Sequence, residues 1–376
     1  MNQISLCMIV KNEESNLQEC LSKIKNLPSE IIIVDTGSTD KTIEIAKQFT
    51  DRIYNFTWIN DFSQARNLSL SKATKSWILI LDADESISET DQELIKTFTT
   101  DNQTDAFVFK HKNYTNDTGV SGWQPSNKQP SNKQPSNNNQ ESRGASGFWT
   151  TDIIRFFKNN PQIRFQGKIH ETVYNSLNQS NLTILNTEIS INHYAELNKQ
   201  KFQEKKQTYS ELLKSRLNNK DFKEKTEDFI CFELATELIK LNKITEAISY
   251  LERAVQISKQ EQTSEQENYL LQLGGLYILN KQLDKAEHTL RKASSINPNN
   301  PSILINQAII ASEKQEYNYA IKKLEKALQL NPNSANAYFN LGIVYKKKNK
   351  PHKANQYFQK ALELNPNYQD KIDSLM

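Results

Sequence analysis

Two apolar runs in the first quarter of the sequence each end in acidic residues. Asp35 follows Ile31–Val34, and Asp82-Ala-Asp84 follows Ile78–Leu81. In an open α/β sheet, ligands bind outside the carboxyl ends of the strands. A buried carboxylate is unfavourable unless it meets water, a metal or a hydrogen bond. A lone acid such as Asp35 is also consistent with a helix cap or a turn, but the Asp-x-Asp pattern with a second strand-end acid favours a binding site.

The elements that must position these acids alternate between strand and helix patterns. Strands are expected at 5–10, 30–34, 52–56, 77–81 and 106–112, and strand-like runs follow at 151–157, 163–165 and 183–193. Helices are expected at 15–24, from 38 or 39 to 49, at 63–73 and at 88–98, the last opened by a capping box at Ser88 and Asp91. This alternation predicts a mostly parallel sheet covered by helices on both faces.

A polar, low-complexity stretch interrupts this pattern at about 114–147. The sequence Gln-Pro-Ser-Asn-Lys occurs at 124–128 and 129–133, and again in part from 134. Such a segment cannot bury a core, so a mobile loop is predicted. It is either an insertion without a role or a lid over the site. The α/β domain is expected to span residues 1–197.

The second half of the chain repeats with a period of 34 residues. Asn-Pro pairs begin at 297, 331 and 365, alanines recur at 286, 320 and 354 and at 293, 327 and 361, and Leu-Gly-x-x-Tyr at 273–277 returns at 341–345. This period and these marks resemble the tetratricopeptide repeat. About four helix pairs are expected in residues 229–376, after a helical linker at 198–228. Such an all-α solenoid binds extended peptides or proteins on its concave face, or it only dimerises or stabilises the enzyme.

Composition narrows the classes of function. The chain has 376 residues, a net charge of +3 and three cysteines far apart in sequence. The charge does not suggest nucleic acid as the main partner, and the cysteines suggest neither disulfides nor a zinc site. No apolar run is long enough to cross a bilayer, and no signal peptide is expected. A cytoplasmic protein is predicted, with peripheral association at the inner face of the membrane left open.

Several segments of the first half together resemble the nucleotide-sugar-binding half of family 2 glycosyltransferases. The resembling segments are 8–13, 33–40, 60–67 and 81–85, and 167–171 with 191–194 resemble a subgroup that joins this domain to tetratricopeptide repeats. That subgroup includes core-oligosaccharide glucosyltransferases and bacteriocin peptide S-glycosyltransferases. The resemblance implies an α/β, Rossmann-like GT-A fold for the first domain.

The resemblance also implies roles for individual residues. Asp35 would accept a hydrogen bond from the base or ribose of a UDP-sugar, and Asp82 would lie near the ribose. Asp84 would bind Mn²⁺ or Mg²⁺ directly, and His193 would add a ligand, although a lone histidine is more often structural. The remaining residues of the expected nucleotide-sugar site are Val10, Asn12, Glu13 and Ala83, with Arg66, and more weakly Arg155, as contacts to the diphosphate.

Family 2 enzymes invert the anomeric centre, so the resemblance implies a single displacement with a carboxylate as the general base. Glu171, beside His170, is the first choice, and Asp152 is the alternative. The family's usual acidic base motif is not clearly spelled out in this chain. A thiol acceptor would need less help from a base, because a thiol ionises near pH 8.5.

The sequence therefore predicts a metal-dependent inverting glycosyltransferase. It would move a hexose or N-acetylhexosamine from a UDP-sugar to a peptide, a protein or a cell-surface glycan, with the repeats holding the acceptor or a protein partner, and a homo-oligomer is compatible with this. The alternative is a non-catalytic tetratricopeptide scaffold with a degenerate transferase domain. A nucleotidyltransferase or an NAD enzyme is disfavoured, because no Gly-x-Gly-x-x-Gly turn follows the first strand.

Overall fold

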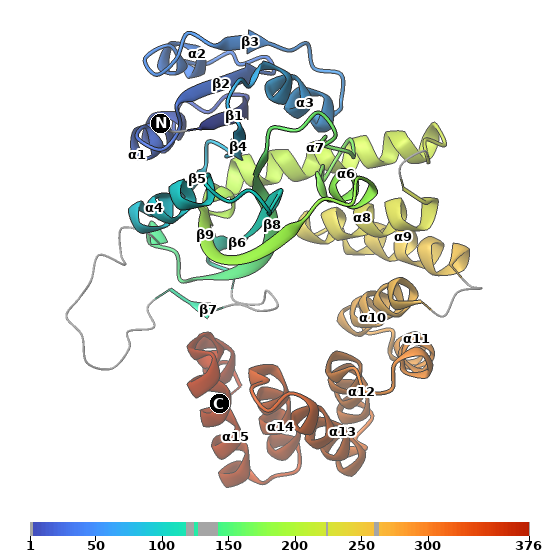
Figure 1. Cartoon of the computed structure of the whole chain (residues 1–376). Helices are drawn as coiled ribbons and strands as arrows, with labels where there is room; N and C mark the ends of the chain where they lie inside the picture. The colour runs from blue at the N-terminus through green and yellow to red at the C-terminus, as the bar shows by residue number, and fades with distance from the viewer. Residues whose placement is uncertain (1–2, 118–123, 127–141, 223–224, 259–262, 376) are drawn as a thin grey trace, which may run out of the picture. The chain divides into compact units, whose positions relative to one another are not determined.

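The computed structural model describes residues 3–117, 124–126, 142–222, 225–258 and 263–375 (Figure 1). The chain divides into two compact units, Met1–Phe202 and Gln203–Met376. The division falls within helix α7 (Lys199–Asn218), which corresponds to the charged helix expected in the linker. Within the described part of the chain, no helix is both long and apolar enough to cross a bilayer.

The first unit is built on one mixed sheet. Its described strands are β1 (Ile4–Val10), β2 (Glu30–Asp35), β3 (Ile53–Asn55), β4 (Trp77–Ile80), β5 (Glu85–Ile87), β6 (Ala106–Thr115), β7 (Gln124–Pro125), β8 (Gly147–Lys158) and β9 (Ile184–His193). The order is β3-β2-β1-β4-β8-β6-β9-β5, with β7 on β8. The strands from β3 to β4 are parallel, as predicted. Beyond β4 the sheet is mixed, because β8 enters antiparallel between β4 and β6.

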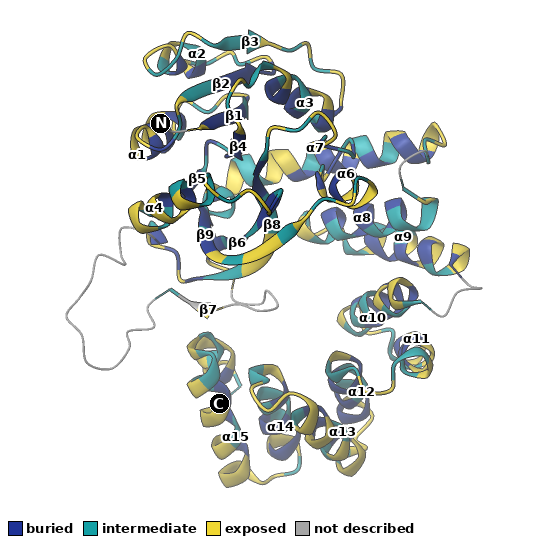
Figure 2. Cartoon of the chain, in the orientation of Figure 1, coloured by how far each residue is buried: buried dark blue, intermediate teal, exposed yellow. Residues whose placement is uncertain are grey.

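Helices cover the central strands, which are buried on both faces (Figure 2). The helices of this unit are α1 (Leu17–Ile24), α2 (Thr42–Ala46), α3 (Phe62–Lys72), α4 (Glu89–Phe98) and α6 (Tyr174–Gln179), with the 3-10 helix η1 (Ala195–Leu197). On β1, Leu6 and Met8 join one apolar cluster, and Cys7 between them joins the other. Because successive side chains of a strand point to opposite faces of the sheet, β1 contributes to two apolar cores, one on each face.

The start of α4 follows the predicted capping signal. The Ser88 side chain accepts a hydrogen bond from the backbone N–H of Asp91. The predicted loop at 114–147 is wrong at its ends, because β6 continues to Thr115, β7 forms at Gln124–Pro125 and β8 begins at Gly147. The pairing of β6 with β8 supplies the hydrogen bonds that extend β6. Residues 118–123 and 127–141, where the lid was placed, lie outside the described residues.

The acids that end or follow the parallel strands lie at one edge of the sheet. β1 and β2 run in register, so that Val10 lies beside Asp35 at their carboxyl ends. β4 is parallel to β1 on its other side and ends two residues before Asp82. The neighbouring loops therefore meet at this edge, where the sequence placed the ligand site.

The second unit consists of antiparallel helix pairs. Its described helices after α7 are α8 (Glu227–Lys240), α9 (Ile244–Ile257), α10 (Ser264–Leu279), α11 (Leu283–Ile296), α12 (Pro301–Glu313), α13 (Tyr317–Leu330), α14 (Ala335–Lys347), α15 (Pro351–Leu364) and α16 (Gln369–Asp373), with the 3-10 helix η2 (Pro366–Tyr368). Successive helices from α8 to α15 pack in pairs. The recurring alanines are all buried within these pairs. The described helices α8 to α15 thus form four helix pairs, of which the last three carry the 34-residue spacing.

Candidate functional site

The loops after β1 and β2 are tied to each other. Asn12 adopts a left-handed backbone conformation, and its side chain accepts a hydrogen bond from the N–H of Thr39 at 2.8 Å. The N–H of Asn12 donates in turn to the Ser38 hydroxyl at 3.0 Å. Asp35 accepts hydrogen bonds from the N–H groups of Gly37 and Ser38, at 3.1 and 3.2 Å. Asp35 is buried, so one of its roles is to shape this turn.

Glu13 connects the same loop to the start of α7. Its carboxylate contacts the Lys201 ammonium at 2.6 Å, and that ammonium also donates to the carbonyl of Asn12 at 2.9 Å. Burial raises the pKa of Glu13 above its usual value, although Lys201 acts in the opposite direction. The first turn of α7 is thus tied to the loop after β1.

Asp82 lies between two buried arginines. Arg66 of α3 contacts one carboxylate oxygen of Asp82 at 2.7 Å, and Arg155 of β8 contacts the other at 3.1 Å. Burial acts to lower the pKa of Arg66, but Asp82 and Glu171 outweigh it, so the pKa is raised and the guanidinium stays charged. Because both oxygens of Asp82 are engaged, its main partners in this structure are arginines.

Glu171 joins this cluster from a distant part of the sequence. It precedes α6 and accepts a hydrogen bond from Arg66 Nε at 2.8 Å. Its side chain is only 12% exposed, whereas neighbouring His170 is exposed and has a positive φ. The structure thus places Glu171 one arginine away from Asp82. Arg66 contacts both carboxylates, and its expected contact with the diphosphate stays a prediction.

Glu85 is fully buried beside the Asp-x-Asp segment. It contacts Arg155 at 3.0 Å and His111 of β6 at 2.8 Å, and it accepts a hydrogen bond from the N–H of Asp82 at 2.8 Å. Burial acts to raise the pKa of Glu85, but Arg155 and the His111 hydrogen bond outweigh it and lower the pKa. Burial lowers the pKa of His111, so this ring is mainly neutral at pH 7.

Asp84 and His193 come together at one end of the cluster. Asp84 follows β4, His193 ends β9, and Asp84 Oδ2 lies 3.6 Å from His193 Nε2. His193 Nδ1 lies 2.8 Å from Asn113 Oδ1, and the ring stacks on His111 with centroids 4.6 Å apart. Both side chains are partly exposed, at 19% and 16%. These are the two residues for which a shared metal was expected.

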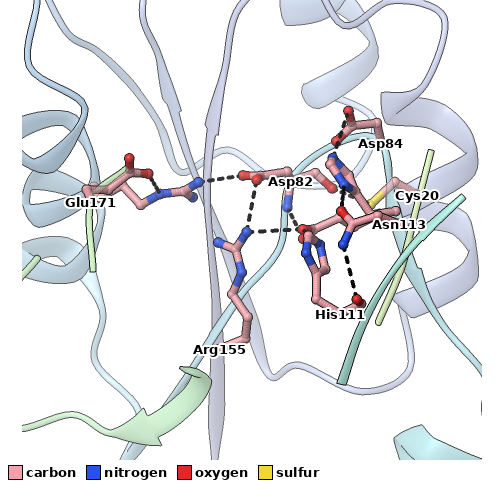
Figure 3. Close-up of polar contacts among 10 residues, drawn as sticks. Cys20, Asp82, Asp84, His111, Asn113, Arg155 and Glu171 are labelled. Carbon is pink, nitrogen blue, oxygen red and sulfur yellow. Dashed lines mark hydrogen bonds and ion pairs between the residues drawn. The ribbon is translucent and has the colours of Figure 1, made fainter. Parts of the chain in front are cut away.

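Together these residues form a continuous network of acidic and basic side chains (Figure 3). From one end to the other, it contains Glu171, Arg66, Asp82, Arg155, Glu85, His111, His193 and Asp84. Glu171, the expected base, lies at one end of this network, and Asp84 and His193, the expected metal ligands, lie at the other end. Val10 and Ala83 are buried beside the loops that carry these side chains.

Two groupings of this site could hold a cation. Ligand atoms at right angles around Mg²⁺ are about 3 Å apart, since each lies about 2.1 Å from the ion. The 3.6 Å between Asp84 and His193 is close to this value, so the pair fits a shared ion with a small adjustment. A second grouping consists of Glu85, His111 and His193, whose ligand atoms lie within 4.8 Å of one another. Arg155 already contacts Glu85 there, and its charge disfavours a dication.

Asp152 lies away from this cluster. It pairs with Lys110 across β6 and β8, both in register and through an ion pair of 2.9 Å, and its side chain is 60% exposed. His111, the next residue on β6, points into the cluster. Because neighbouring residues on a strand point to opposite faces, Asp152 faces the other side of the sheet from His111.

Several residues of the cluster were not found from the sequence. Glu85 lies in segment 81–85, but no role was predicted for it. Its position directly after Asp84 is a signal that could have drawn attention to it. His111 and Asn113 lie on β6 at alternate positions, which marks a shared face, but nothing local distinguishes them from polar strand residues. Lys201 is one of many lysines in a charged helix and carries no sequence signal at all.

Protein-family models match the two parts of the chain separately. Residues 5–163 match the model for glycosyl transferase family 2. Residues 312–349, 335–368, 230–261 and 267–300 match models for the TPR or tetratricopeptide repeat. The first match includes Asp35, Asp82 and Asp84, and it ends before Glu171 and His193.

Relatives match only parts of the chain. A stretch of 178 residues, 47% of this chain, is 35% identical to a TPR repeat-containing protein of Synechococcus elongatus and covers 37% of that protein. A stretch of 174 residues, 46% of the chain, is 31% identical to the SPbeta prophage-derived glycosyltransferase SunS of Bacillus subtilis and covers 35% of it. An uncharacterized glycosyltransferase of Rickettsia typhi is 34% identical over 96 residues, which are 26% of this chain and 32% of that protein. The matched stretches thus span about a third of each relative.

Among solved structures, MamA is 21% identical with a TM-score of 0.35, over 46% of this chain and 95% of MamA. YrrB, described as a TPR protein with an unusual peptide-binding site, is 17% identical with a TM-score of 0.36, over 48% of this chain and 94% of YrrB.

Proposed function

We propose that this chain, which joins a family 2 glycosyltransferase domain to tetratricopeptide repeats, is a metal-dependent inverting glycosyltransferase. It moves a hexose or N-acetylhexosamine from a UDP-sugar to a peptide, a protein or a cell-surface glycan. The observation that carries the proposal is the meeting of Asp84 and His193 at the edge of the sheet, 3.6 Å apart and partly exposed.

The chemistry of the pair fits the proposed cofactor. A carboxylate oxygen suits Mn²⁺ or Mg²⁺, and a diphosphate brings further hard oxygens. When bound, such an ion neutralises the charge that develops on the departing nucleotide. Asp84 and His193 would hold such an ion, and the loops of Asn12, Glu13 and Asp35 would contact the nucleoside.

Glu171 is the proposed general base. As the acceptor oxygen or sulfur attacks the anomeric carbon, its proton passes to the Glu171 carboxylate, the bond to the acceptor forms, and the bond to the UDP phosphate breaks. Arg66 binds one oxygen of Glu171 at 2.8 Å and thereby fixes its orientation. The same guanidinium holds Asp82, so base and nucleotide site are kept at a constant spacing.

The alternative is a scaffold whose transferase domain no longer reacts. One observation favours it: both carboxylate oxygens of Asp82 are engaged by arginines, as expected if the residue now serves stability. Asp84 weighs against it, because this acid stays partly exposed beside His193. The 3.6 Å between the two side chains fits a shared cation, which a domain without a ligand would not need.

The test is hydrolysis of UDP-glucose and UDP-GlcNAc by the purified chain with Mn²⁺, followed as release of UDP. We expect slow hydrolysis by the wild type and none by Asp84→Ala, with Asp84→Asn as the conservative variant. Asp51→Ala is the matched control, because Asp51 is exposed at the amino end of β3, opposite the site. Equal rates in Asp84→Ala and the wild type would remove the metal role. Calorimetry that detects no UDP binding would favour the scaffold.

The acceptor needs a separate experiment. A peptide library and a set of lipid-linked glycans are each incubated with the chain and a labelled UDP-sugar, and the label is located by mass spectrometry. Label on a peptide side chain supports a peptide or protein acceptor, and label on a glycan supports a cell-surface precursor. Transfer that survives deletion of residues 229–376 would contradict acceptor binding by the repeats.

A further inference from the structure

We propose that Asn113 is a positioning residue that fixes the tautomer of His193, so that Nδ1 carries the ring proton and Nε2 is presented to the cation. This inference rests on the proposed function, because it concerns the same metal site. It adds a residue that neither the family comparisons nor the sequence motifs assign to the site.

The backbone brings the two side chains together. β6 and β9 are parallel neighbours, and Asn113 and His193 are partners in their register. Partners of this kind lie side by side on the same face of a sheet. Asn113 Oδ1 lies 2.8 Å from His193 Nδ1, and Asn113 is buried with only 6% of its surface exposed. A buried contact of this length is a hydrogen bond that one of the two atoms must donate.

The other end of the amide decides which atom donates. Asn113 Nδ2 lies 3.2 Å from the backbone carbonyl of His111, which can only accept a hydrogen bond. The NH₂ group must therefore face His111, and the amide oxygen must face His193. Because that oxygen cannot donate, the proton in the contact belongs to His193 Nδ1.

The ring is also held against rotation. His111 stacks on it with an interplanar angle of 21°, and His111 is itself anchored to Glu85 at 2.8 Å. With Nδ1 turned to Asn113, Nε2 is the nitrogen that faces Asp84, at 3.6 Å from its carboxylate. In a neutral ring with Nδ1 protonated, Nε2 carries the lone pair that a metal ligand needs.

The expected effect is large for a residue that does not touch the ion. Partners that orient a ligating histidine typically contribute about 10–100-fold to metal affinity. Asn113→Leu keeps the approximate size of the side chain and removes the acceptor, so the ring should lose its fixed tautomer. Asn113→Asp restores an acceptor for His193 but cannot donate to the His111 carbonyl, so it should recover part of the affinity.

The tautomer can be read directly in the metal-free chain. The chain has five histidines, so ¹⁵N labelling of histidine alone gives a simple two-bond ¹H–¹⁵N spectrum, and His193→Gln identifies the His193 signals. At pH 8 we expect Nδ1 of His193 to be protonated and Nε2 to be unprotonated. Asn113→Leu should shift the ring toward the Nε2-protonated form. Protonation of Nε2 in the wild type, or an unchanged tautomer in Asn113→Leu, would overturn the proposal.

Metal affinity is the second measurement. Mn²⁺ is titrated calorimetrically into the full chain with UDP present. Asn113→Leu should bind about 10–100-fold more weakly than the wild type, and Asn113→Asp should bind more tightly than Asn113→Leu. Asn186→Leu is the matched control, because Asn186 is exposed on β9. Unchanged affinity in Asn113→Leu would refute the positioning role. Absence of Mn²⁺ binding to the wild type would instead refute the metal-dependent function, while the spectra would still decide the tautomer.

Discussion

Replacing Arg155 with methionine tests whether arginines stabilise the network of acidic and basic side chains that runs from Glu171 to Asp84. Arg155 is buried on β8 and contacts Asp82 at 3.1 Å and Glu85 at 3.0 Å. Asp82 would keep Arg66 as a counter-charge. Glu85, whose side chain is fully buried, would keep, among the described residues, only a mainly neutral histidine and a backbone N–H as partners.

The magnitude follows from that burial. Breaking a buried ion pair by removing one partner typically costs about 3–5 kcal/mol, because the other charge is left without compensation. We expect a loss of this size in the free energy of unfolding of the first unit at pH 7–8. Methionine fills most of the arginine stem's volume, so the loss of packing is a smaller part of the effect.

The pH dependence has a definite sign. In the wild type the pKa of Glu85 is lowered below its ordinary 4.5, since Arg155 and His111 outweigh burial. That contribution to stability is present above the unfolded pKa and is lost as the pH falls through the folded pKa. Without Arg155, we expect burial to outweigh the His111 hydrogen bond and to raise the folded pKa of Glu85 above its unfolded value. Glu85 then destabilises the fold as the pH rises, so the substitution should cost more at pH 8 than at pH 5.

Urea unfolding followed by tryptophan fluorescence measures this effect on the first unit alone, because all four tryptophans, at 58, 77, 123 and 149, lie before residue 202. Lys110→Met is the matched control on the neighbouring strand. Its ion pair with Asp152 is exposed, so a change of about 0–1 kcal/mol is expected at either pH. A loss below 1 kcal/mol for Arg155→Met, or one that does not depend on pH, would refute the reasoning.

Two further predictions concern the base and the repeats. Glu171→Gln should lower the rate of sugar transfer by about 10²–10⁴-fold while the calorimetric affinity for UDP stays close to that of the wild type; a wild-type rate would exclude Glu171 as the base. In α10, a Cβ added at Gly274 would lie 2.6 Å from the buried Leu290 side chain, so Gly274→Ala should destabilise the repeats by about 1–3 kcal/mol. At the adjacent Gly275 the nearest atom is 3.8 Å away, so Gly275→Ala should be neutral or stabilising by up to about 1 kcal/mol. Circular dichroism during urea unfolding compares the two, and equal effects would contradict the packing argument.

Much of the architecture could be predicted from local sequence patterns. Apolar runs that end in acids predicted β2 and β4 with Asp35 and Asp82 behind them, and the structure has these strands in a parallel arrangement. The 34-residue period predicted the helix pairs, because small residues recur wherever two helices approach closely. Such signals are readable because each arises from residues that are near one another in sequence.

The strand order and directions in the mixed half of the sheet could not be predicted from local sequence patterns. β8 lies antiparallel between β4 and β6, and β6 pairs with β9, although these strands are separated by long stretches of chain. An apolar run shows that a strand forms but carries no information about its neighbour or its direction. The opposite faces of Asp152 and His111 follow from register and alternation, which only the paired strands reveal.

The sequence by itself determined which acids reach the edge of the sheet and that a repeat domain follows, because strand ends and helix periods are local properties. Only the tertiary structure decided what each acid contacts. Arg66 and Glu171 are 105 residues apart, and Asn113 and His193 are 80 apart, yet each pair is joined by a hydrogen bond of 2.8 Å. Which buried charge finds which partner depends on how strands and loops pack in space, since electrostatic compensation acts over a few ångströms and takes no account of distance along the chain.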